Sequence, residues 1–132
     1  MFGLFQPPEL KATLAALDDL RPSFKQDSQA VEIAFGGARR MILMEKANTV
    51  ACVRDRKWKP RDLALLVVSK LAFRRAASGE YHVYRNAPSP VGVGLRSIFD
   101  QVGEEMVASG FIEQAEHEED KRTLRKAMSE VG

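Results

Sequence analysis

The sequence contains only one cysteine, Cys52, so no disulfide can form within the chain and nothing indicates an oxidising compartment. Long apolar runs are also missing, because the longest, residues 63–68, is far shorter than the roughly 18 residues that cross a membrane. The apolar residues 1–5 lack the basic flank and the long apolar stretch of a secretory signal. We therefore expect a cytoplasmic protein that does not enter a membrane.

Patterns typical of catalytic or metal sites are scarce. The two histidines lie far from Cys52 in the sequence, and no nucleophile elbow is present. Glu113, His117 and Asp120 share one helical face, but a metal site in a helical bundle needs ligands from a second helix. We interpret this face as a solvated acidic surface and expect neither a metal nor a cofactor.

The region before the fifth predicted helix also resembles a phosphate site only superficially. Residues 81–85 alternate in polarity and predict a short extended segment, and residues 86–94 have the composition of a loop. Gly92-Val93-Gly94 lacks the third glycine of a dinucleotide-binding pattern, since position 97 is Ser97. We interpret these glycines as a flexible entry into the next helix.

The strongest structural signal is a central core helix predicted over residues 60–77. Pro60 suits the first helical position, where its missing N–H costs nothing. Residues 63–68 are apolar on every side, which is typical of a helix surrounded by protein. The pattern predicts that Leu66 and Val67 are almost fully buried.

Three other helices follow from apolar residues that recur every three or four positions. They are expected over about residues 7–21, 95–109 and 113–130. Gly110 is expected to end the second of these in a left-handed conformation, so that the last two helices form an αα-hairpin.

Residues 30–53 fit two structures. As strands, Val31, Ile33 and Phe35 alternate with other residues, and Gly36-Gly37 suits a hairpin turn. As a helix, small residues and methionines recur at spacings of three or four, although two adjacent glycines cost about 2 kcal/mol relative to alanine. We favour the helix; antiparallel strands here would give an α+β fold.

Charges of opposite sign are separated along the sequence, although the total is only +2. Residues 39–75 carry a net charge of +8 and residues 100–132 a net charge of −5. The separation indicates either an anionic partner or two parts of one fold that face each other, and we favour the second. Glu104, Glu105 and the acidic half of the last helix are then expected to meet the basic segment 54–61, within one chain or across a dimer.

The basic segment supports a nucleic-acid hypothesis. Five cations that can neutralise phosphates surround the single tryptophan, which can stack on a base. The alternative is that the tryptophan staples the start of the central helix against Leu63 while the charges are solvated. The residues concerned are Arg54, Arg56, Lys57, Trp58, Lys59 and Arg61.

The sequence thus predicts one mainly α domain over residues 1–132, with about five helices and a short extended segment at 81–85. We interpret it as a small non-enzymatic protein-interaction module that binds a protein partner or itself, with a homodimer favoured. A nucleic-acid-binding protein that uses residues 54–61 is the second hypothesis. An enzyme with a site near His82, using Tyr84 or Cys52, is the third.

Overall fold

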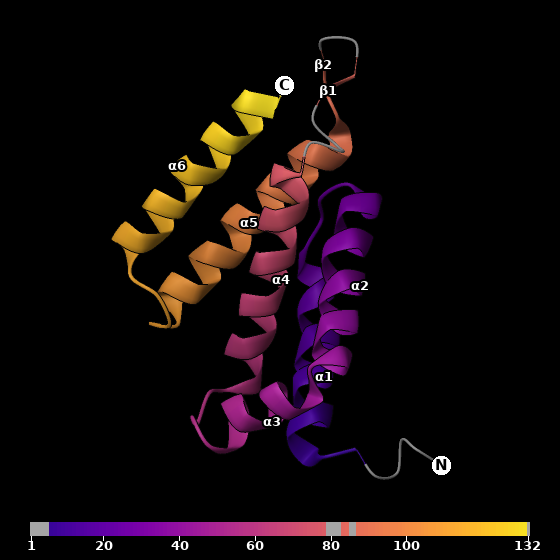
Figure 1. Cartoon of the computed structure of the whole chain (residues 1–132), viewed down its shortest axis with the longest axis vertical. Coiled ribbons are helices and arrows are strands. Elements are labelled where there is room, and N and C mark those ends of the chain that lie inside the picture. Colours follow the sequence, from indigo (N-terminus) through magenta and orange to yellow (C-terminus); the bar gives the residue numbers. More distant parts are fainter. Residues whose placement is uncertain (1–5, 79–82, 85–86, 132) are drawn as a thin grey trace.

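The structure is a computed structural model that describes residues 6–78, 83–84 and 87–131. In these residues the fold is mainly α, as predicted, with helices packed around one core. The elements in chain order are α1 (Pro8–Leu20), the 3-10 turn η2 (Arg21–Ser23), α2 (Ser28–Met44), α3 (Lys46–Arg54), α4 (Pro60–Ala77), β1 (Val83–Tyr84), β2 (Ala87–Pro88), α5 (Pro90–Ala108) and α6 (Gln114–Val131) (Figure 1).

Helix α4 is the central helix, and the sequence-based prediction of its range is confirmed. It packs against α1 and α2 on one side and against α5 and α6 on the other, while α3 lies at one end (Figure 1). Leu65 and Val68 are fully buried and Val67 is buried. The prediction for Leu66 was wrong, because its side chain is only partly buried and lines a groove between α4 and α6.

Residues 28–54 form two helices, so the alternative of antiparallel strands was wrong. Ala30, Ala34 and Ala38 form a fully buried stripe on α2. A Cβ added at Gly37 would lie 2.8 Å from Leu71 Cδ1, so the glycine lets α4 approach α2 closely. The helical path breaks at Glu45, whose φ of −110° and ψ of 50° are not helical, and this break gives six α-helices in the described residues instead of the expected five or so.

The predicted loop over residues 86–94 was wrong from Pro90 onward, where α5 begins. Gly94 lies inside this helix. A Cβ at this position would come within 2.8 Å of Ala30 Cβ, so the glycine permits α5 to pack closely on α2. Of the predicted extended segment, Val83–Tyr84 form β1, which pairs with β2 in an antiparallel manner. Residues 81, 82 and 85 lie outside the described residues.

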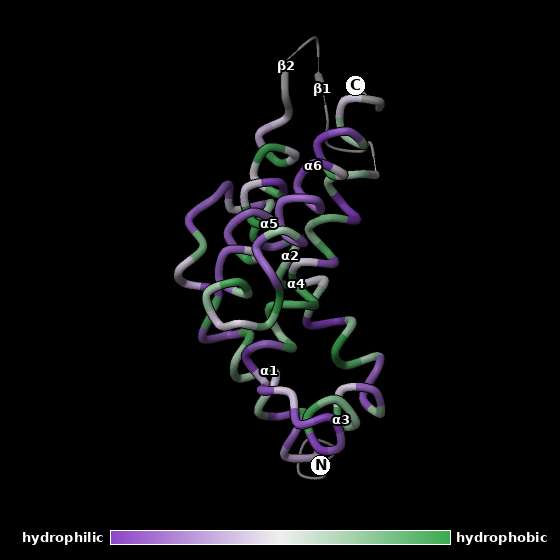
Figure 2. Tube along the Cα trace, turned by 90° about the vertical axis from the view of Figure 1, so that its left-hand side faces the viewer, coloured by the Kyte–Doolittle hydropathy of each residue, from purple (hydrophilic) through white to green (hydrophobic). Residues whose placement is uncertain are grey.

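The αα-hairpin of α5 and α6 is confirmed. Gly110 has a φ of +78°, and the two hydrogen bonds of a Schellman motif are present, from Phe111 N to Met106 O at 2.9 Å and from Gly110 N to Val107 O at 3.0 Å. The outer helix α6 carries mostly hydrophilic residues, whereas α4 is largely apolar (Figure 2). None of the helices in the described ranges is long and apolar enough to cross a membrane.

Candidate functional site: two grooves beside α4

An apolar groove of about 730 Å³ lies between α4, α5 and α6, and we call it the α4–α6 groove. Its size falls within the range of ligand and peptide pockets. Its lining is Leu66, Ser69, Lys70, Phe73, Arg74, Ala77 and Ser78 of the α4 region, Phe99 and Met106 of α5, Ile112 of the turn, and Glu116 and Asp120 of α6.

The groove remains open because α6 is attached to the rest of the molecule by few large side chains. Leu124 and His117 are buried, each with 1% of its surface exposed, whereas most other described side chains of α6 are exposed or half-buried. Phe73 and Phe99 meet edge to face at 5.4 Å and form part of the apolar wall. Rigid aromatic rings of this kind keep the wall apolar and in place.

The two edges of the α4–α6 groove carry opposite charge. Lys70 and Arg74 are exposed on α4, and Glu116 and Asp120 are exposed on α6. None of these four forms an ion pair with another described residue. The groove therefore has an apolar interior, a basic edge and an acidic edge.

A second groove, of about 570 Å³, lies on the other side of Lys70 and Arg74, between α2 and α4. We call it the α2–α4 groove. A hollow of about 330 Å³ adjoins it and shares Leu71, Arg74 and Arg75. At its edge Met44 is 83% exposed, which is unusual for a large apolar side chain. The lining is Gly37, Arg40, Met41, Met44, Glu45, Lys70, Leu71, Arg74 and Arg75.

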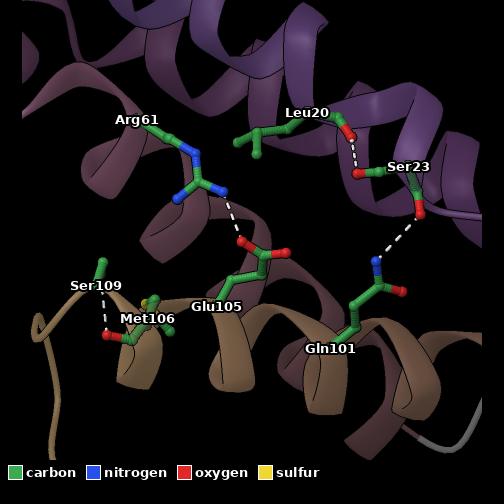
Figure 3. A network of polar contacts seen from close by, with 7 residues as sticks. All are labelled: Leu20, Ser23, Arg61, Gln101, Glu105, Met106 and Ser109. Atoms are coloured by element: carbon green, nitrogen blue, oxygen red, sulfur yellow. Dashed lines mark hydrogen bonds and ion pairs between the residues drawn. The ribbon is translucent and has the colours of Figure 1, made fainter.

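The basic segment 54–61 is partly engaged in ion pairs within the chain. Arg54 donates from Nε and Nη2 to the two carboxylate oxygens of Glu9 at 2.8 and 3.0 Å, and these hydrogen bonds lower the pKa of Glu9. Arg61 donates to Glu105 at 2.5 Å, as Figure 3 shows, so the expected meeting of Glu105 with this segment occurs within one chain. The remaining cations, Arg56, Lys57 and Lys59, are exposed.

Trp58 is half-buried and meets the ring of Phe111 edge to face at 5.3 Å. This contact joins the start of α4 to the turn between α5 and α6. The same turn is held by Ser109, whose hydroxyl donates to Met106 O at 3.0 Å, and α5 is tied to the end of η2 by Gln101 Nε2, which donates to Ser23 O at 3.1 Å (Figure 3).

The interpretation of the Glu113, His117 and Asp120 face as a solvated surface was wrong at His117. This imidazole packs against α5, and its Nε2 has no hydrogen-bond partner among the described residues. No group of three metal-ligating side chains is found in the part of the chain that the structure describes. Burial raises the pKa of the carboxyl group of Asp100 on α5, and the charge of Lys121 opposes this rise.

The residues of the predicted enzyme site are not brought together in what the structure describes. Cys52 is a free, buried cysteine on α3. His82 and the side chain of Tyr84 lie outside the described residues. The sequence analysis did not identify Lys70 and Arg74 as the residues that separate the two grooves. The available signal was that these charged residues interrupt the apolar sequence of α4 and so mark its exposed face.

No family model, curated protein or solved structure matches this chain. The function is therefore argued from the two grooves and the basic segment.

Proposed function

We propose that this chain is a non-enzymatic protein-interaction module that binds an amphipathic helix of a partner protein in the α4–α6 groove. The observation that carries the proposal is the combination of an apolar interior with edges of opposite charge. Amphipathic helices bind apolar grooves through anchors at positions i, i+3, i+4 and i+7. Leu66, Phe73 and Ile112 are partly buried and line the space in which such anchors would lie.

The charged edges define the chemistry of the partner. An acidic flank would lie beside Lys70 and Arg74, and a basic flank beside Glu116 and Asp120. Charges arranged in this way discriminate between orientations and partners more than they raise affinity. The apolar anchors would supply most of the binding, at about 1.5–3 kcal/mol for each side chain that is fully buried. Because association itself costs at least about 4 kcal/mol, we expect an affinity no tighter than micromolar.

The test is selection from a displayed library of helical peptides with apolar residues at i, i+3, i+4 and i+7. We expect enriched peptides to carry acidic residues on one flank and basic residues on the other. Leu66→Gln combined with Ile112→Gln should reduce their binding at least tenfold, because both substitutions place amides in the groove. Val93→Gln is the matched control, since Val93 is 42% exposed and does not line the groove. No enrichment, or equal loss in the control, would refute the proposal.

Two other occupants would give different results. If the groove binds a small apolar molecule, the neutral dye Nile red should bind with micromolar affinity while no peptide is enriched. If a second copy of the chain fills the groove, sedimentation should show a species of twice 14.7 kDa that the Leu66→Gln and Ile112→Gln variant lacks. The second result would make self-association, which the sequence also indicated, the actual activity of this groove.

Nucleic-acid binding by segment 54–61 is a second candidate function. Its specific support is that Arg56, Lys57 and Lys59 are exposed. Each phosphate contact would make the logarithm of affinity fall with the logarithm of salt concentration by about 0.7–0.9. Changing all three cations to glutamine should flatten this slope; a slope that remains unchanged would remove the candidate.

A further inference from the structure

The α2–α4 groove concentrates positive charge in a hollow that shares Lys70 and Arg74 with the α4–α6 groove but lies on their other side. Arg40, Lys70, Arg74 and Arg75 contribute four cations to its lining, and Glu45 is the only carboxylate among the lining residues that the structure describes. Among the described residues, Arg40, Lys70 and Arg74 form no ion pair. Like charges gathered in this way repel one another, and a bound anion would relieve that repulsion.

The cations come from two helices that Gly37 brings close together. A Cβ built on Gly37 would lie 2.8 Å from Leu71 Cδ1 and 4.0 Å from Arg40 Nη2. A Cβ on the preceding residue, Gly36, would lie 3.8 Å from Arg40 Nη1. The guanidinium of Arg40 is therefore folded back over the two glycines, and a carboxylate oxygen of Glu32 lies 3.0 Å from the same Cβ position at Gly36.

The groove also has an apolar part. Met41, Met44 and Leu71 line it, and Met44 remains largely exposed. No aromatic side chain is among the described lining residues, so the groove offers no surface on which a base could stack. Guanidinium groups bind phosphate through two parallel hydrogen bonds, and flexible methionines adapt to aliphatic groups of varied shape.

We propose that the α2–α4 groove binds a small organic phosphate, with the phosphate between Arg40 and Arg74 and the aliphatic part against Met41, Met44 and Leu71. A volume of about 570 Å³ is suited to a ligand of this kind. Both a soluble phosphomonoester and the headgroup region of a phospholipid present this chemistry. The test must therefore separate these two sources.

The test is calorimetric titration with three probes, octyl phosphate, inorganic phosphate and octanol, in low-salt buffer. We expect saturable binding of octyl phosphate, weaker binding of inorganic phosphate and no detectable binding of octanol. In the Arg40→Gln and Arg74→Gln double variant, affinity for octyl phosphate should fall about 10- to 100-fold, because two charged hydrogen-bonding partners are lost. The control, Arg56→Gln with Lys59→Gln, removes the same charge from the exposed segment and should leave affinity within about twofold.

Three results would overturn the proposal. The first is no binding of octyl phosphate at millimolar concentration, and the second is an equal loss of affinity for octyl phosphate in the control variant. The third is a loss of this affinity in the Leu66→Gln and Ile112→Gln variant, which would place the octyl chain in the α4–α6 groove instead. Sedimentation with vesicles that contain a phosphatidic acid distinguishes the sources. A lipid headgroup is identified if the protein sediments with the vesicles, octyl phosphate displaces it, and the Arg40→Gln and Arg74→Gln variant does not sediment. A soluble ligand is identified if the protein binds octyl phosphate but does not sediment with the vesicles.

Discussion

The replacement of Gly103 by alanine tests how α6 is attached. Gly103 lies in α5 directly below the imidazole of His117. A Cβ at this position would lie 1.9 Å from His117 Cε1, 2.1 Å from Nδ1 and 2.6 Å from Nε2. Ordinary contact begins near 3.4 Å, so the ring would have to retreat by about 1.5 Å. Because His117 is buried, this retreat would also move Leu124, the other large buried side chain of α6.

The expected cost follows from two opposing effects. Overpacking a tightly filled site costs about 1–3 kcal/mol, and a clash with a buried ring belongs in the upper half of that range. Alanine has a greater helix propensity than glycine, which returns about 1 kcal/mol. We therefore expect Gly103→Ala to lower the free energy of unfolding by about 1–2 kcal/mol. In a His117→Ala background the ring is absent, and the same substitution should instead stabilise the protein by about 0.5–1 kcal/mol.

The assay is chemical denaturation and thermal melting of the four proteins in this double-mutant cycle, in which 1 kcal/mol corresponds to roughly 4 °C. Gly36→Ala is the matched control. Its Cβ would meet only the flexible ends of two side chains, Glu32 at 3.0 Å and Arg40 at 3.8 Å, so this substitution should be neutral or stabilising. If Gly103→Ala stabilises the wild-type protein as much as the His117→Ala variant, the packing of His117 on Gly103 is refuted.

Three other substitutions test particular elements. Gly110→Ala should destabilise by about 1 kcal/mol or more because of its φ of +78°, although nothing lies within 4 Å; an unchanged melt would contradict the Schellman ending of α5. Trp58→Ala should lower the melting temperature through loss of the contact with Phe111, and it should leave nucleic-acid affinity and its salt dependence unchanged; a stably folded variant whose affinity for single strands falls would favour base stacking. Asp100→Asn should stabilise the protein at pH 7, because the raised pKa of Asp100 means that its charged carboxyl group lowers the stability of the native state. The gain should vanish below about pH 3, where the carboxyl group is protonated in the native and the unfolded state alike. A gain that persists in acid would indicate an effect of packing instead.

The helices were predictable wherever local signals agreed. Pro60 at the start of α4 and Gly110 after α5 each have one favoured backbone role, and both adopt it. Residues 30–53 were ambiguous because Gly36 and Gly37 are poor in a helix when considered alone. The reason for a glycine at position 37 is seen only when α4 lies against α2, because Leu71 then packs directly on Gly37.

The same reason explains the error at the start of α5. A stretch with Gly92 and Gly94 has the composition of a loop, since glycine is unfavourable in an isolated helix. Packing against Ala30 outweighs this preference in the folded protein. Similarly, Leu66 was expected to be buried because all its neighbours in sequence are apolar, and only the position of α6 shows that this face opens into a groove.

For the candidate grooves, the sequence predicted only that charges of opposite sign are separated along the chain. Of the expected meeting between the basic segment and the acidic region, the pair of Arg61 with Glu105 is present, whereas no ion pair among the described residues joins segment 54–61 to Glu104 or to α6. The sequence could not show which charges remain without a partner, because that depends on the angle at which helices cross.

The distribution of ion pairs supports an open α4–α6 groove as a feature of the fold. Lys70 and Arg74 face the acidic edge formed by Glu116 and Asp120, yet no ion pair between these described residues joins the two edges. Exposed ion pairs contribute only about 0–1 kcal/mol, so their attraction is too weak to draw α6 against α4. Closing the groove would also require His117 to leave its place against Gly103, with the loss of a buried contact. Packing inside the αα-hairpin therefore holds the two edges apart, and a helix that carries charges on both flanks would satisfy both edges without moving α6.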